Sequence, residues 1–180
     1  MKDMWPWPPL PDLVKARLAA MAAEDDEEND DEGGERPAPG VDPHTGEALD
    51  RVVRPWDLTM LDEEMRPAVM GWLDDVVMWL NHSYGWQDSQ VIPGCWPRHL
   101  GLAHDLAALA FGRLDAYEPS TAAYVGRWHS DLEDFHRRMA VALGESGRDC
   151  QIGKHKVPSE YTVTAVQQEI ARRKNADRVS

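Results

Sequence analysis

The chain has little of what several functional classes require. It holds only two cysteines in 180 residues, which excludes a small secreted scaffold stapled by disulfides. No run approaches the roughly 20 apolar residues of a membrane span, and the N-terminus lacks the apolar core and cleavage site of a signal peptide. We therefore expect a cytoplasmic protein with no membrane segment, whose cysteines are free thiols or metal ligands.

Positive charge is also scarce, with 19 lysines and arginines against 32 acidic residues and a formal net charge of −13. Nine of the acids lie between Glu24 and Glu35, a stretch without a single base. Proteins bind phosphate backbones mainly through Lys and Arg, so direct nucleic-acid binding is disfavoured. The acidic tract is compatible with a DNA mimic. The basic cluster Arg172–Lys174 is compatible with a nucleic-acid-associated protein, which is a further alternative.

Familiar catalytic motifs are missing as well. The sequence contains no Gly-x-Ser-x-Gly elbow, no phosphate-binding glycine loop ending in Lys-Ser/Thr, and no His-Glu-x-x-His. Cys95 with His99 one turn later has the spacing of a thiolate pair. The neighbouring Gly94 and Trp96 serve a tight turn equally well. The sequence therefore favours a protein that is not an enzyme, and it assigns no catalytic residue.

Helical periodicity, in contrast, is abundant. Apolar residues step by three and four between residues 119 and 144, at Val125, Trp128, Leu132, Phe135, Met139 and Leu143. Further helices are expected from Pro67 to about His82 and from Pro97 or Arg98 to Tyr117. Thr59 and Asp62 have capping-box spacing ahead of the first of these. Because no long alternating strand pattern occurs, we predict an all-α fold: a compact bundle of about four helices with a tethered short N-terminal helix.

The chain divides into three parts by composition. Residues 1–23 form a Trp/Pro-rich docking segment and a short helix. Residues 24–48 read as a disordered acidic and Gly/Pro-rich linker, because they cannot bury enough apolar surface to offset chain entropy. Residues 49–180 form the helical domain, with a last helix expected over residues 159–174.

The N-terminal segment has the chemistry of a docking motif. Trp5 and Trp7 alternate with prolines, and Leu10, Val14 and Leu18 continue at helical spacing. In this reading the five residues bind an unknown protein partner or a second copy of the chain. Deleting residues 1–23 is then expected to abolish partner capture and to leave thermal stability nearly unchanged. The alternative is a tail that folds back and covers the bundle.

The stretch Trp86–His104, WQDSQVIPGCWPRHLGLAH, carries the sharpest chemical pattern. Cys95-x3-His99 recurs later as Cys150-x4-His155, so each cysteine has a histidine four or five residues downstream. Structural zinc takes four Cys and His ligands, commonly as two close pairs, and the two sulfurs should then lie roughly 3.5–4 Å apart. The spacing falls outside the familiar Cys-x2–4-Cys patterns. Alternatively, Cys95 is a small buried residue and His155 is a solvated loop residue between two lysines.

A histidine cluster is the second candidate site. His129 and His136 lie seven positions apart and share one helix face, and His104 on the preceding helix is placed to meet them. Three imidazoles suit a metal or a proton shuttle. The alternative is that they border the apolar stripe and form local hydrogen bonds.

From residue 51 the sequence resembles a known group of proteins. The matching text comprises RVVRPWDLTMLDEEM, VIPGCWPRH, the HDLAALA helix, RWHSDLEDFHRRM and Cys150-x4-His155. It is similar to small actinobacterial proteins that carry a domain of unknown function, often from plasmid, phage or other mobile-element neighbourhoods. The similarity covers roughly the last two-thirds of the chain, and VIPGCWPRH is its most specific piece. The resemblance implies a compact helical domain and lends no activity.

Three hypotheses follow from the sequence. The leading one is a non-enzymatic cytoplasmic interaction or regulatory protein that uses the N-terminal segment, and the resemblance implies that it belongs to a mobile element. The alternative is a zinc-binding protein that uses the two Cys–His pairs, structurally or catalytically. The further alternative is the DNA mimic or nucleic-acid-associated protein.

Overall fold

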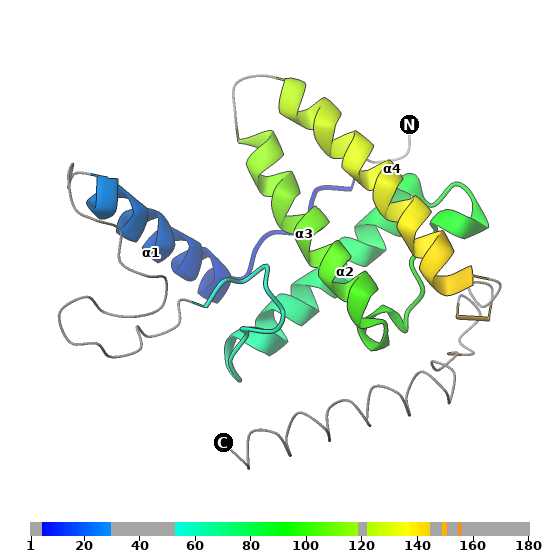
Figure 1. Ribbon diagram of the computed structural model, residues 1–180, viewed down its shortest axis with the longest axis horizontal. Coiled ribbons are helices and arrows are strands. Elements are labelled where there is room, and N and C mark those ends of the chain that lie inside the picture. The colour runs from blue at the N-terminus through cyan, green and yellow to red at the C-terminus, as the bar shows by residue number, and fades with distance from the viewer. Residues whose placement is uncertain (1–4, 30–52, 119–121, 145–148, 151–154, 156–180) are drawn as a thin grey trace, which may run out of the picture.

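The computed structural model describes residues 5–29, 53–118, 122–144, 149–150 and 155, with side chains left out for 24–29. Its elements are α1 (Asp12–Asn29), α2 (Met65–Tyr84), α3 (Leu100–Tyr117) and α4 (Ala123–Leu143), with 3₁₀ turns η1 (Asp88–Gln90) and η2 (Trp96–Arg98). No strand occurs in these ranges. Figure 1 shows α3 and α4 side by side, α2 crossing them, and α1 projecting to one side. The predicted all-α bundle with an additional N-terminal helix is confirmed.

The end of the first helix differs from the prediction. Helix α1 ends at Asn29 and not at Ala23, so the first six residues of the predicted linker are helical. Glu is a strong helix former, whereas the prediction rested on apolar periodicity alone. The remaining linker, residues 30–48, and the predicted last helix, residues 159–174, lie outside the described residues. Among the helices that the structure describes, none is long and apolar enough to span a membrane.

The start of α2 is capped by Asp62. Its Oδ1 accepts hydrogen bonds from the backbone N–H groups of Glu64, at 3.0 Å, and Met65, at 2.6 Å. The predicted partner in a capping box, Thr59, instead bonds Asp57 through both its backbone N–H and its hydroxyl. The capping box is therefore wrong in its pairing, although Asp62 does mark the start of the helix.

Replacing Asp62 with alanine should lower the free energy of unfolding by about 1 kcal/mol, the typical value for loss of a helix cap. The cause is the loss of an acceptor for two backbone donors that the helix itself cannot satisfy. Urea denaturation measures the change. Glu63→Ala, an exposed neighbour, is the control and should stay within about 0.5 kcal/mol of the parent. Equal effects of the two substitutions would contradict the capping role.

The N-terminal segment packs against α2 of the same chain. The Nε1 of Trp72 donates to the carbonyl of Pro8 at 3.2 Å, and the Nε1 of Trp79 donates to the carbonyl of Trp5 at 2.9 Å. Val14 in α1 is fully buried. Leu10 and Leu18 pack against the same core. This packing agrees with the alternative given above, a tail that covers the bundle, and it predicts that residues 1–23 contribute to stability.

An arginine sits among the aromatic rings that receive this tail. The Arg113 guanidinium carbon lies 4.2 Å from the ring centroid of Trp7 and 3.9 Å from that of Tyr117. The rings of Trp79 and Trp128 are 5.1 and 5.5 Å away. Burial lowers the pKa of Arg113, and the surrounding π faces offset part of the desolvation that causes this shift. Arg113 thereby links the N-terminal segment to α2, α3 and α4.

The stripe on α4 forms the other side of the core. Trp128, Leu132, Phe135, Met139 and Leu143 are buried as predicted, and Val125 is half-buried. The helix stops at Gly144, whose φ of +52° favours glycine. This stop brings the chain to the end of the bundle, where the second cysteine lies.

Candidate metal centre

The loop that carries the first Cys–His pair is fixed to α2 by a side-chain clamp. The Nδ2 of Asn81 donates to the carbonyl of Ile92 at 2.9 Å, and its Oδ1 accepts from the Ile92 N–H at 2.8 Å. Gly85 ends α2 next to this clamp, and a Cβ there would lie 2.5 Å from the Asn81 carbonyl oxygen. Only glycine therefore permits this close turn.

A second anchor fixes the loop one residue beyond Cys95. Trp96 is 1 % exposed, and its Nε1 donates to Asp74 Oδ1 in α2 at 2.9 Å. Trp96 begins η2, which ends at Arg98, so His99 precedes α3 directly. The predicted start of α3 at Pro97 or Arg98 is too early, because the Cys95–His99 spacing is bridged by a 3₁₀ turn. This turn and its anchors fix the backbone of both residues.

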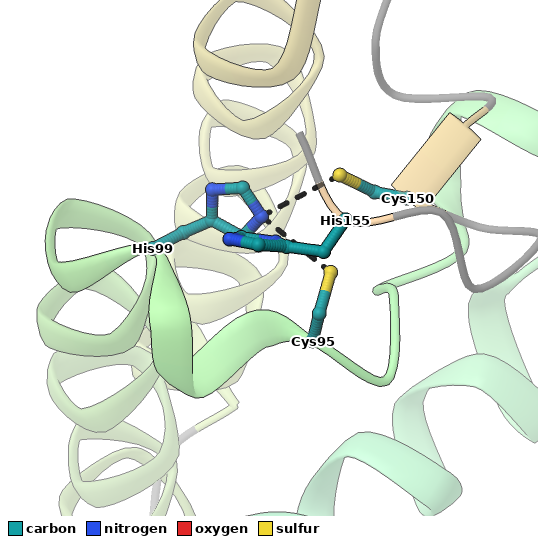
Figure 2. Close-up of side chains that lie close together, drawn as sticks. All are labelled: Cys95, His99, Cys150 and His155. Carbon is teal, nitrogen blue, oxygen red and sulfur yellow. Dashed lines mark hydrogen bonds between the residues drawn. The ribbon is translucent and has the colours of Figure 1, made fainter. Parts of the chain in front are cut away.

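Four side chains converge at this end of the bundle. Figure 2 shows Cys95, His99, Cys150 and His155 pointing toward one another from two segments of the chain. One donor atom from each lies within 4.8 Å of all the others. The Nε2 of His99 lies 3.5 Å from the Sγ of Cys95 and 3.5 Å from the Sγ of Cys150. The sequence pattern thus predicted which residues meet, although they are 50 or more positions apart.

The centre is sheltered from solvent. Cys150 is 1 % exposed, and Cys95, His99 and His155 are half-buried. Burial raises the pKa of the Cys95 thiol, and its hydrogen bond with Cys150 raises it further. Burial lowers the pKa of His99, and the nearby His155 lowers it further. Both shifts favour the uncharged forms of Cys95 and His99.

The donor set fits a tetrahedral metal ion. Zinc bonds of about 2.3 Å to sulfur and 2.0–2.1 Å to nitrogen, at tetrahedral angles, place a sulfur and a nitrogen about 3.5 Å apart. Both sulfur-to-His99 distances have this value. The Nδ1 of His155 is buried, and none of the residues that the structure describes forms a hydrogen bond with it. A buried polar atom without a hydrogen-bond partner destabilises the folded state. A metal ion bound to the imidazole of His155 would compensate for part of this cost.

The histidine cluster does not form as a metal site. His129 and His136 line a pocket of about 320 Å³ together with Tyr84, Trp86 and Glu133, whereas His104 is not among the residues that line it. Within the described part of the chain, the Cys–His group is the only set of three or more Cys, His or acidic ligands close enough for one ion. Burial lowers the pKa of His136, which is the behaviour of a histidine at the border of the core.

Sequence reasoning missed the residues that position the centre. Asn81 and Asp74 lie on α2, and both bond the loop that carries Cys95. Asn81 directly follows Trp79 and Leu80 in the sequence, and that local pattern does not mark it as a residue that binds the loop. The indole N–H groups of Trp72, Trp79, Trp96 and Trp128 each donate a hydrogen bond, whereas the buried Nε1 of Trp7 has no partner among the described residues.

Comparison with protein-family models, curated proteins and solved structures found no match for this chain. The chemistry of the site therefore rests on its own residues.

Proposed function

We propose that the chain is a zinc-binding helical protein in which Cys95, His99, Cys150 and His155 hold one structural zinc ion. The observation that carries this proposal is the convergence of four donor atoms within 4.8 Å, two from each of two distant segments. Two sulfurs and two nitrogens in tetrahedral array are the donor set of zinc among common biological metals.

The ion would be a structural cross-link between two segments of the chain and not a catalyst. Catalytic zinc keeps one position open for water or substrate, whereas four protein ligands fill a tetrahedral shell. One pair of ligands sits on the loop that Asn81 and Asp74 fix to α2. The other pair follows α4 after Gly144. Zinc would join the end of α4 to the α2–α3 crossover.

Metal analysis of the reduced, purified protein tests the proposal. We expect about one zinc ion per chain, and cobalt substitution should give the visible absorption of a tetrahedral site with thiolate ligands. Cys150→Ser should abolish tight binding, because it removes the most deeply buried donor. His104→Ala is the control, since His104 lies on α3 outside the group, and it should bind one zinc ion like the parent.

Two results would reject the proposal. One is a reduced protein that retains no zinc after incubation with an equimolar amount of the metal. The other is equal zinc content in Cys150→Ser and the parent, which would place the ion on other ligands.

A further inference from the structure

The two thiols of the centre are neighbours of one another as well as of His99. Their sulfurs lie within 4.8 Å, and the tetrahedral geometry of zinc would place them about 3.75 Å apart. A disulfide needs an S–S distance of about 2.05 Å. Cys95 lies in a turn, and Cys150 lies beyond the end of α4. A small local movement of the two sulfurs would therefore convert a zinc-bound thiolate pair into a disulfide.

We infer that the Cys95–Cys150 pair is a thiol–disulfide switch. Under oxidising conditions, a disulfide between the two residues replaces the zinc ion as the cross-link. This inference rests on the proposed zinc site and adds its regulation. The chain has no other cysteine, so the internal disulfide has only one possible pairing. Because the bond uses both thiolates, the disulfide and the zinc complex exclude each other.

The oxidant we name is a small disulfide such as that of glutathione. The sulfur of Cys95 attacks one sulfur of the oxidant, a bond forms between them, and one glutathione thiolate leaves. The sulfur of Cys150 then attacks Cys95 in this mixed disulfide and displaces the second glutathione thiolate. The protein sulfurs lose two electrons in total and the oxidant gains two. The two leaving thiolates take up protons from the solvent, because the zinc-bound sulfurs carry none, and the zinc ion is released.

Burial sets the order of the two steps. Cys150 is 1 % exposed, whereas Cys95 is half-buried, and thiol–disulfide exchange requires access for the oxidant. Cys95 is therefore the attacking residue and Cys150 the resolving one. Both end states join the same two positions of the chain, 55 residues apart, so oxidation retains the link between α4 and the crossover.

The test adds oxidised glutathione to the zinc-loaded full chain and follows two signals. A colorimetric chelator reports free zinc, and mass spectrometry of unreduced peptides reports the Cys95–Cys150 bond. We expect one zinc ion released for each disulfide formed, and complete recovery after addition of a dithiol and zinc. Zinc retained at full oxidant, or released without the internal disulfide, would overturn the inference.

Variants separate this inference from the proposed function. Cys150→Ser should trap glutathione on Cys95, whereas Cys95→Ser should leave Cys150 unmodified because it is buried. Equal modification of both variants would overturn the assigned order. Loading with zinc is measured before oxidant is added, so a chain that binds no zinc rejects the proposed function at that step. A chain that binds zinc but forms no internal disulfide rejects the switch alone.

Discussion

Zinc added to the metal-free, reduced protein should raise the unfolding Tm by about 8–16 °C once free zinc reaches a thousand times its Kd. A ligand that binds only the folded state at that concentration stabilises it by about 4.1 kcal/mol. For chains of this size, each kcal/mol shifts the Tm by about 2–4 °C. In the unfolded chain, bringing the two Cys–His pairs together costs the entropy of closing a loop of about 50 residues. Differential scanning calorimetry across a zinc series measures the shift.

Two controls decide whether this shift comes from the proposed centre. Cys150→Ser should show almost no response to zinc. Magnesium, which prefers oxygen ligands, should not stabilise the parent. A similar rise of the Tm for the variant and the parent would mean that zinc acts elsewhere on this acidic chain.

The four residues that converge could be predicted as two pairs, because spacing alone groups them. Cys95 and His99 are four positions apart and Cys150 and His155 are five apart, so each pair is local in the sequence. That the pairs meet depends on the length of α4 and on where it stops. The apolar stripe of α4 and Gly144 encode both features. The site was thus within reach of pattern reasoning once the bundle itself was recognised.

What sets the loop geometry was not predictable in the same way. The clamp of Asn81 joins a helix to a loop residue 11 positions later, and nothing in the local pattern distinguishes it from an exposed asparagine. Whether the N-terminal tail packs on its own chain or on a partner was likewise not predictable from the sequence. The sequence pattern is compatible with these apolar residues packing on their own chain or on another. Only the fit of Trp7 among the aromatic rings decides between the two.

Replacing Trp7 with alanine should lower the free energy of unfolding by about 3 kcal/mol, the lower end for loss of a large core aromatic, because this indole is half-buried. The ring contacts Trp79 at a centroid distance of 4.9 Å and carries Arg113 at 4.2 Å. Its removal opens a cavity, and the guanidinium of Arg113 loses its contact with the Trp7 ring. Denaturant unfolding measures the loss, and the Tm should fall by about 6–12 °C.

The matched control is Trp86→Ala. That indole is 86 % exposed, so its loss should change stability by no more than about 0.5 kcal/mol. A double-mutant cycle with Arg113→Met then isolates the contact between the guanidinium and Trp7, where residues in contact show coupling of about 0.5–3 kcal/mol. If Trp7→Ala were as mild as Trp86→Ala, the tail would contribute nothing to its own bundle. Its tryptophans would then be available to a partner, as the sequence alone suggested.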